Sequence, residues 1–301
     1  MLSIYIMTNI VSLLKFIIRH PLNKKNKGKA LLRFMKWQIC SRLNPYAIVY
    51  PFTGRASLVI KKGMTGATQN LYCGLHEFYD MGFLLHLLRE GDLFVDIGAN
   101  IGAYTVLASG HIEARTIAVE PVPSTFLHLL NNISINRMSD RVIPINAALG
   151  AEKGSINFTS SLDTMNHVAR GDESDMIKVT VDTLDGILHQ QQKVPLLLKI
   201  DVEGFETEVL KGAPETLQRK ELKAIIIELN GSGARYGYDE HQIHKDLLSL
   251  HFMPFQYHPE KRLLIAANGF GTHNTIYIRD VDFVKSRLEN AEKVSILKQD
   301  I

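Results

Sequence analysis

Five short apolar runs, separated by stretches with helical spacing, limit how this 301-residue chain can fold more than any other feature. The runs cover residues 93–98, 116–120, 141–148, 196–201 and 224–229. Apolar runs of about four to eight residues without polar alternation are typical of strands buried on both faces, as in a parallel sheet. Between the second and third runs, residues 123–136 place apolar side chains on one helical face. The alternation predicts an open, doubly wound α/β sheet.

Further segments extend this pattern on both sides. Residues 47–52 and 56–61 flank a turn-like segment and predict a hairpin, and a helix is expected from about Leu75. After a helix near 240–250, three closing strands that pair antiparallel are expected at 252–257, 262–267 and 274–279. We therefore expect a Rossmann-like domain over residues 75–301, with a mostly parallel seven-stranded sheet and an antiparallel edge. A basic N-terminal helical and hairpin extension is expected over residues 1–74.

Residues 154–180 interrupt the alternation of strands and helices. A strand-like GSINFT is followed by a polar segment rich in Ser, Thr, Asp and Asn, and then by IKVTVD. This pattern predicts a hairpin insertion. Its loop, Ser160–Asp175, is expected to be mobile and to lie near the mouth of the site, since binding loops are commonly carried on a rigid scaffold.

Charge is distributed unevenly along the chain. Residues 1–76 hold 12 Lys and Arg and no acid, whereas the remainder holds 22 basic and 31 acidic residues. A basic arm on an acidic body favours an anionic partner, such as lipid head groups or a charged glycan. A solvated basic surface without a specific partner is the alternative.

The first 18 residues are apolar, but Thr8, Asn9, Ser12 and Lys15 interrupt them, so no membrane span is expected. A secretory signal is not expected either, because the positive charges follow the apolar run instead of preceding it. Leu2, Ile6, Ile10, Leu13 and Ile17 recur at helical spacing. The amphipathic helix that they predict either packs against the body, which we favour, or lies on the inner membrane face. Only two cysteines occur, which favours a reducing, cytoplasmic setting.

The first chemical motif, VDIGANIGAYT at residues 95–105, leaves a buried strand and enters a helix. Glycine at such a turn lets the backbone approach a ligand closely. A dinucleotide site would space its glycines as G-x-G-x-x-G, whereas Gly98 and Gly102 stand four apart with Asn100 between them. The carboxylate of Asp96 would repel a pyrophosphate and attract an ammonium group. The motif therefore favours the amino-acid end of S-adenosylmethionine.

Two later strand ends complete a nucleoside site. Glu120 ends the second strand, where a carboxylate can accept hydrogen bonds from both ribose hydroxyls. Asn146 and Ala147, after the third strand, are placed to contact adenine, although Asn146 is equally suited to a turn.

The second motif, KIDVEGFE at residues 199–206, follows the fourth run. Strand C-termini open onto the ligand crevice in a doubly wound sheet, so Asp201 and Glu203 are expected where the methyl group and the acceptor meet. Both are candidate general bases, and Lys199 qualifies only if burial lowers its pKa. Their alternative role is structural, in pairing with Lys199 or capping the helix that begins near Gly204.

In this order and spacing, VDIGANIGAYT, AVEP, KIDVEGFE and IIIELN resemble the FkbM-type family of S-adenosylmethionine-dependent methyltransferases, from about Glu77 to Asn230. The resemblance implies a class I methyltransferase fold and oxygen methylation. It implies acceptors such as sugars of surface polysaccharides, lipopolysaccharide or glycosylated natural products, and some polyketide hydroxyls. By position, it implies cofactor contacts at Asp96, Gly98, Asn100, Gly102, Tyr104 and Glu120, and Glu77 matches an acid that the family shows before the first motif.

The residues and the resemblance together predict an S-adenosylmethionine-dependent O-methyltransferase of polysaccharide biosynthesis, acting on a sugar, a glycan or another hydroxyl-bearing acceptor. Asp201 with Glu228 and Asn230 also resembles the ligand layout of magnesium-dependent catechol-type methyltransferases, so a divalent metal is an alternative. A catalytically silent relative that binds glycans or membrane surfaces is the runner-up, ahead of a nicotinamide oxidoreductase. Nucleic acid is not an expected partner, because the body is acidic.

Overall fold

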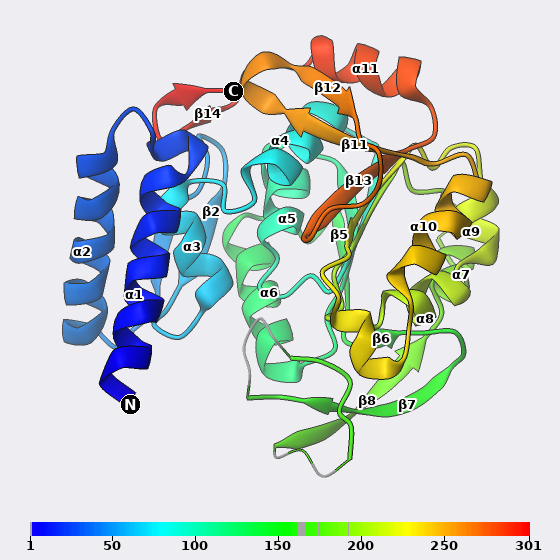
Figure 1. Cartoon of the computed structure of the whole chain (residues 1–301), viewed down its shortest axis with the longest axis horizontal. Helices are drawn as coiled ribbons and strands as arrows, with labels where there is room; N and C mark the ends of the chain where they lie inside the picture. Colours follow the sequence, from blue (N-terminus) through cyan, green and yellow to red (C-terminus); the bar gives the residue numbers. More distant parts are fainter. Residues whose placement is uncertain (1, 162–165, 172, 174, 192) are drawn as a thin grey trace.

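The computed structural model describes residues 2–161, 166–171, 173, 175–191 and 193–301. Its centre is an eight-stranded sheet with helices on both faces (Figure 1). Five strands are parallel, and all five correspond to the predicted apolar runs: β3 (Leu93–Ile97), β4 (Arg115–Val119), β5 (Val142–Ile145), β9 (Leu197–Ile200) and β10 (Ala224–Glu228). The expected Rossmann-like, doubly wound sheet is confirmed.

Three strands close the sheet at its antiparallel edge, as predicted. They are β11 (Met253–His258), β12 (Leu263–Ala266) and β13 (Asn274–Ile278). The strand order is β12-β11-β13-β10-β9-β3-β4-β5, so β13 inserts between β10 and β11. All five apolar runs and all three closing strands join this one sheet, so it has eight strands and the expected number of seven is corrected.

Each face of the sheet has its own apolar core. One core packs under α4 (Phe78–Leu87) and α6 (Pro123–Ile135) and includes Val284 and Leu288 of α11 (Val281–Glu289). The other lies under α7 (Leu184–His189), α8 (Glu206–Lys211), α9 (Pro214–Gln218) and α10 (Glu240–Ser249). Helices thus cover both faces and leave the carboxyl ends of the parallel strands for a ligand, as is usual in this fold class.

The predicted hairpin insertion is present. Strands β7 (Gly154–Thr159) and β8 (Met176–Asp182) pair antiparallel and form a separate small sheet with β6 (Ala148–Leu149). Part of the loop that we expected to be mobile, residues 162–165, 172 and 174, lies outside the described residues. Phe158 and Asn166, near the two ends of that gap, line the main cavity described below.

Before the sheet, the chain forms two long helices, a hairpin and a third helix. These elements are α1 (Leu2–Arg19), η1 (Pro21–Asn23), α2 (Lys27–Leu43), β1 (Ile48–Pro51), β2 (Ser57–Ile60) and α3 (Thr65–Cys73). Ile17 of α1 and Leu58 of β2 are fully buried in the same core as α4 and α6. Asn132 of α6 also accepts a hydrogen bond from the backbone of Val59, at 2.7 Å. Helix α1 therefore packs against the body through Ile17, while Ile10 stays 46% exposed.

Two further features of this part of the chain bear on the sequence expectations. Cys40 is exposed and Cys73 is buried, and both are free. Among the described residues, the helices are all too short or too polar to cross a bilayer.

Candidate functional site

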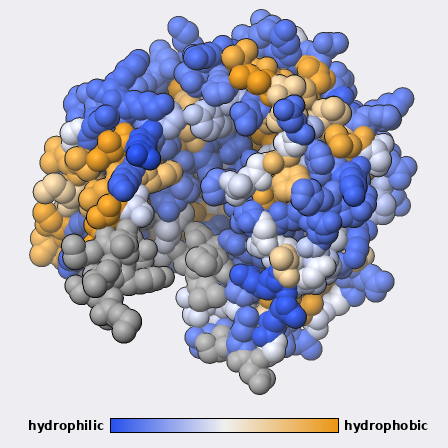
Figure 2. Space-filling model, viewed as in Figure 1, coloured by the Kyte–Doolittle hydropathy of each residue, from blue (hydrophilic) through white to orange (hydrophobic). Residues whose placement is uncertain are grey.

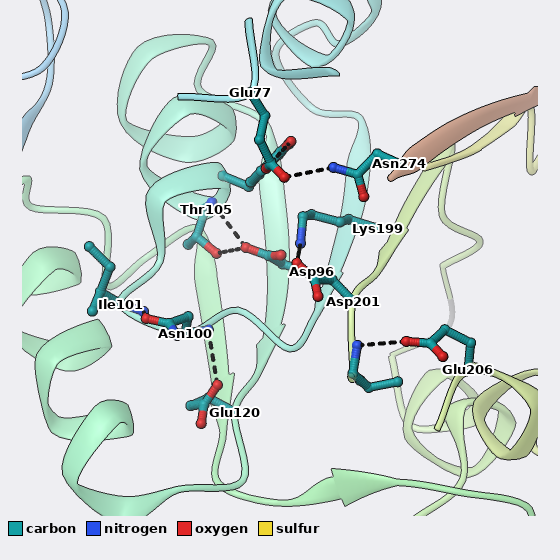
Figure 3. A network of polar contacts seen from close by, with 12 residues as sticks. Glu77, Asp96, Asn100, Ile101, Thr105, Glu120, Lys199, Asp201, Glu206 and Asn274 are labelled. Carbon is teal, nitrogen blue, oxygen red and sulfur yellow. Dashed lines mark hydrogen bonds and ion pairs between the residues drawn. The ribbon is translucent and has the colours of Figure 1, made fainter. Parts of the chain in front are cut away.

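A cavity of about 320 Å³ opens where the carboxyl ends of β3, β4, β9 and β10 meet. Most side chains that the sequence predicts to bind or react line this cavity, and Figure 3 shows several of them. Those that line it are Glu77, Asp96, Gly98, Asn100, Tyr104, Glu120, Lys199, Asp201 and Glu203. The parallel sheet brings them together because each follows, or packs beside, the end of a strand.

Asp96 lies at the end of β3 and is 1% exposed. Its Oδ2 accepts hydrogen bonds from the backbone N–H and the hydroxyl of Thr105, at 3.1 and 2.7 Å. Its Oδ1 is buried and has no partner among the described residues. Burial raises the pKa of Asp96, while Lys199 opposes that shift. A buried carboxylate oxygen without a partner costs free energy, so this atom is suited to a positively charged donor from a ligand.

The glycine turn after β3 is shaped by protein packing as well as by a ligand. Gly98 has φ +77°, and a Cβ at this position would lie 1.8 Å from the backbone oxygen of Asp201. Gly102 has φ +85°, and a Cβ there would lie 2.5 Å from Leu129. From the sequence alone, both glycines are expected to let a ligand approach the backbone closely. The structure shows that they also let the turn pack tightly against the loop after β9 and against α6.

Glu120 follows β4 and is 5% exposed. Each of its carboxylate oxygens accepts one backbone N–H: Oε2 from Asn100 at 2.9 Å and Oε1 from Val122 at 3.0 Å. Burial raises the pKa of Glu120 to about 7, although these two hydrogen bonds oppose the shift. Each oxygen retains capacity for a further donor, as two neighbouring hydroxyls would provide.

Asn146 and Ala147 lie differently from the other predicted cofactor residues. The side-chain amide of Asn146 donates to the backbone oxygens of Glu120 and Pro121, at 2.8 and 3.1 Å. This matches the alternative turn role and fixes the segment after β4. Ala147 lines a small hollow that shares Gly98 and Pro121 with the main cavity. An adenine contact therefore stays a prediction for Ala147, while the Asn146 side chain is already engaged.

Lys199 is buried on β9, at 3% exposed. Its Nζ donates to Asp201 Oδ2 at 2.7 Å and lies 4.8 Å from the ring centre of Tyr104. Burial alone would lower the pKa of Lys199, but the carboxylates of Asp201, Glu77 and Asp96 outweigh it and raise the pKa. The condition under which Lys199 could act as a base is therefore not met. It is a fixed cation that orients Asp201.

Glu77 precedes α4 and is held from two directions. Tyr104 donates its hydroxyl to Glu77 Oε2 at 2.7 Å, and Asn274 of β13 donates to Oε1 at 2.8 Å. Burial raises the pKa of Tyr104 well above its ordinary value, so its hydroxyl keeps its proton and remains a donor. The sequence motif offers no signal for Asn274, which comes 197 residues after Glu77.

Three carboxyl groups converge beside Lys199. Asp201, Glu203 and Glu228 each place an oxygen within 4.8 Å of the other two. Burial and the charge of Asp201 raise the pKa of Glu203 to about 7, and burial with the charges of Asp201 and Glu203 raises that of Glu228 to about 8. Glu203 also adopts φ +55°, a left-handed conformation that is uncommon for a non-glycine residue.

The structure changes two details of the motif after β9. Asn230, which the metal alternative grouped with Asp201 and Glu228, is exposed and accepts a hydrogen bond from the backbone of Ser232 at 2.9 Å. Glu203 takes its place in the acidic cluster. Glu206 is 1% exposed and accepts backbone hydrogen bonds from Val202 and Gly204, both at 3.1 Å, so it shapes the loop.

A second, larger cavity adjoins the first. Its volume is about 1080 Å³, and it shares His76, Glu77 and Glu228 with the first cavity. Its other walls come from α1, from the start of α4 and from strands β11 and β13. Glu228 ends strand β10, so its place at the carboxyl edge of the sheet follows from the strand pattern. The role of α1 as a cavity wall was missed, because no local pattern relates residues 12–19 to the sheet.

The sequence model of the methyltransferase FkbM domain matches residues 96–270, which is more than half of the chain. Among curated proteins, the chain is similar to hexuronic acid methyltransferase AglP of Haloferax volcanii. The two are 29% identical over 208 residues, which cover 69% of this chain and 75% of that protein. It is also 29% identical to methyltransferase 1 of Beauveria bassiana over 159 residues, which cover 45% of this chain and 64% of that protein.

Among solved structures, precorrin-6y C5,15-methyltransferase of Geobacter metallireducens aligns with a TM-score of 0.42 and 14% identity. The alignment covers 77% of this chain and 100% of that chain.

Proposed function

The chain belongs to the FkbM methyltransferase family, and on this premise we propose that it transfers a methyl group from S-adenosylmethionine to a hydroxyl oxygen of a sugar. The observation that carries the proposal is the junction of the two cavities at Glu77 and Glu228. One cavity has the carboxylates that a cationic nucleoside requires, and the other is large enough for an acceptor. An acidic group stands where the two meet.

The smaller cavity fits S-adenosylmethionine better than a dinucleotide. The unpartnered Oδ1 of Asp96 suits the ammonium group of the amino-acid end, and Glu120 suits the two ribose hydroxyls. A pyrophosphate at the turn would meet the carboxylate of Asp96 at close range in a buried site, which is unfavourable. Ala147, which lines the small hollow beside this cavity, would contact the adenine.

When bound, S-adenosylmethionine supplies the methyl group from its sulfonium and leaves as S-adenosylhomocysteine. The protein must then orient the acceptor hydroxyl and take its proton. Glu228 is the strongest candidate for that base, because it lines both cavities and burial raises its pKa to about 8, close to working pH. The charge of Asp201, which Lys199 contacts at 2.7 Å, raises the pKa values of Glu203 and Glu228 and so strengthens them as bases.

A divalent cation is the alternative use of the same three acids. Oxygen ligands suit Mg²⁺, and Asp201, Glu203 and Glu228 stand close enough to share an ion. Lys199 already neutralises Asp201 at 2.7 Å, which favours proton transfer over metal binding. Activity retained in a chelator would support the proton-transfer role, and activity restored only by Mg²⁺ would support the metal.

A sugar acceptor is supported by the name of the similar hexuronic acid methyltransferase, and polysaccharide biosynthesis would be the setting. Calorimetric titration with S-adenosylhomocysteine, with NAD as the control, tests the donor. We expect binding of S-adenosylhomocysteine alone, with its affinity lowered at least about tenfold in Glu120→Gln, which loses a charged acceptor. NMR of the methylated product then identifies the acceptor atom. A folded protein that binds neither ligand would support the silent binding relative instead.

We also propose that the N-terminal extension contacts an anionic membrane surface, at the cytoplasmic face. Helix α2 carries four large apolar side chains at helical spacing that are 56–80% exposed: Leu32, Met35, Ile39 and Leu43. Figure 2 shows the apolar surface over the α1 and α2 side of the molecule. Lys36 and Arg42 are exposed on the same helix. Apolar side chains flanked by cations match the chemistry of helices that lie in the head-group region.

A further inference from the structure

The larger cavity has a wall that comes from the basic N-terminal extension. Ser12, Lys15, Phe16 and Arg19 line it from α1, at the spacing of a single helical face. Lys24, just after η1, continues the same wall. The opposite walls belong to the sheet domain, from the start of α4 to the strands β11 and β13. The extension therefore forms part of the space into which an acceptor would enter.

The cations of this wall are not neutralised by the protein. Lys15, Arg19 and Lys24 are all exposed, and none of them forms a salt bridge within the described part of the chain. Three cations that face a cavity without acidic partners attract an anion and would bind it by charge-assisted hydrogen bonds.

The wall that the sheet domain supplies has the reverse character, because Glu77, Asp80 and Glu228 line the cavity from that side. Burial and the charge of Glu77 raise the pKa of Asp80 to about 7, and burial with its acidic neighbours raises that of Glu228 to about 8. In their ionised form, these carboxyl groups accept hydrogen bonds from hydroxyls and repel an anion. An acceptor with an anionic group would therefore be oriented with that group toward α1 and a hydroxyl toward Glu228.

Aromatic side chains from both walls also line the cavity. Tyr79 is 41% exposed and stacks edge-on against His258, with ring centres 5.4 Å apart. Phe16 is 38% exposed and stacks edge-on against His76 at 5.4 Å. Exposed aromatic faces inside the cavity suit the apolar faces of a sugar ring. With a volume of about 1080 Å³, the cavity has room for more than one sugar unit.

We propose that the acceptor is an anionic saccharide, whose carboxylate or phosphate binds Lys15, Arg19 and Lys24 while one of its hydroxyls reaches Glu228. The proposal rests on the proposed methyl transfer and adds the class of acceptor and the residues that select it. The hydroxyl loses its proton to Glu228 as its oxygen bonds to the methyl carbon, and the carbon–sulfur electron pair remains on S-adenosylhomocysteine.

The test compares matched acceptors on the full chain. The probes are a glucuronate-containing tetrasaccharide, its carboxyl-reduced neutral counterpart, and glucose 1-phosphate. Binding of each probe and of S-adenosylhomocysteine is measured by calorimetry, and methyl transfer is measured with labelled donor. The variant Lys15→Gln/Arg19→Gln removes two cavity cations. The variant Lys61→Gln/Lys62→Gln removes two exposed cations of the same extension that lie outside the cavity, and serves as control.

We expect the charged tetrasaccharide to bind at least about tenfold more tightly than its neutral counterpart. The cavity variant should lose that preference, while the control keeps it and both bind S-adenosylhomocysteine normally. Preference for the phosphate over the uronate would identify the anion as phosphate. Equal binding of charged and neutral probes, or a preference that survives in the cavity variant, would overturn the proposal.

Two results distinguish a failure of the proposed methyl transfer from a failure of the proposed acceptor class. Failure to bind S-adenosylhomocysteine would contradict the proposed methyl transfer itself. Binding of S-adenosylhomocysteine with methylation of neutral sugars alone would overturn only the anionic acceptor. A product methyl group that mild alkali releases would be an ester, which would place the carboxylate at Glu228 and contradict the proposed orientation.

Discussion

Gly98 combines a left-handed backbone with a close approach to the loop after β9. Its φ is +77°, and a Cβ would lie 1.8 Å from the backbone oxygen of Asp201. Gly91 shares the conformation, at φ +81°, but has open space around it. The pair therefore separates the cost of the backbone conformation from the cost of the clash.

We expect Gly98→Ala to lower the free energy of unfolding by several kcal/mol and to weaken binding of S-adenosylhomocysteine, because Asp201 must move. Gly91→Ala should cost only about 1 kcal/mol, which is typical of left-handed strain alone. Urea denaturation of both variants measures the two costs. Equal losses of stability would show that the loop relaxes around the new methyl group.

The pH dependence of turnover should follow the deprotonation of Glu228. Burial raises its pKa to about 8, and a base must be deprotonated to accept a proton. With saturating donor, kcat should rise with pH and level off above about pH 8. Glu228→Gln should lower kcat by about 10²-fold or more and abolish that rise. Glu221→Gln, an exposed acid just before the same strand, is the control. A rise that persists in Glu228→Gln would assign the titration to another group.

The site residues that could be predicted from the sequence are those that lie at strand ends. Asp96 and Glu120 each end a buried strand, and the parallel sheet brings such positions to one edge. The contact between Glu77 and Asn274 could not be predicted, since it joins residues 197 apart across an edge strand. The state of Lys199 was also out of reach, because its pKa depends on three surrounding carboxylates.

Among the secondary-structure elements, those with a clear apolar pattern could be predicted from the sequence. The five parallel strands are continuous apolar runs, and each appears within two residues of its expected start. The order of β11 and β13 could not be predicted, because antiparallel strands can pair in several orders with the same pattern. Helix α11 was missed, since only Val284 and Leu288 of its nine residues are buried.

Helix α2 has an apolar stripe whose side chains are largely exposed instead of buried. Its Leu32 and Ile39 are 64% and 56% exposed, and each would gain about 1.5–3 kcal/mol on full burial in a lipid surface. We expect Leu32→Ser/Ile39→Ser to lower binding to anionic vesicles at least tenfold in a sedimentation assay. Neutral vesicles should bind the unchanged protein more weakly.

The control for this change is Leu127→Ser/Ile135→Ser on α6, whose side chains are 60% and 40% exposed. That variant should bind vesicles normally. Vesicle binding that the α2 variant retains would contradict the membrane proposal. A dimer in analytical ultracentrifugation that the α2 variant abolishes would assign the stripe to a second copy of the chain.

Across the whole molecule, burial raises the pKa values of acids and lowers those of histidines, and so favours the neutral form of both. Six described carboxyl groups in or near the cavities have raised pKa values: Asp80, Glu120, Glu203 and Glu206 at about 7, Glu228 at about 8, and Asp96. His20 and His86 have pKa values that burial lowers, to about 4 and about 3. Each group makes folding depend on pH in its own window.

Between pH 6.5 and 8 the acids outweigh the histidines, because a histidine of the unfolded chain, with its ordinary pKa of 6.5, is at most half protonated there. The unfolded chain has released their protons, at an ordinary Glu pKa of 4.5, while the folded protein still holds part of them. Folding therefore takes up protons, and stability falls as pH rises through the folded pKa values. Below pH 6.5 the unfolded chain also protonates His20 and His86, which opposes this trend. The most stable pH of the ligand-free protein should thus lie near or below 6.5.

We expect the Tm of the ligand-free protein to be higher at pH 6.5 than at pH 8. Glu203→Gln/Glu228→Gln should reduce that difference, because it removes two of the six carboxyl groups with raised pKa values, including Glu228 at about 8. Thermal melts of both proteins at the two pH values provide the measurement. A Tm that rises from pH 6.5 to 8 would mean that these carboxyl groups are already ionised in the folded protein at pH 6.5. In that case Glu228 would have too low a pKa for the pH profile of turnover expected above.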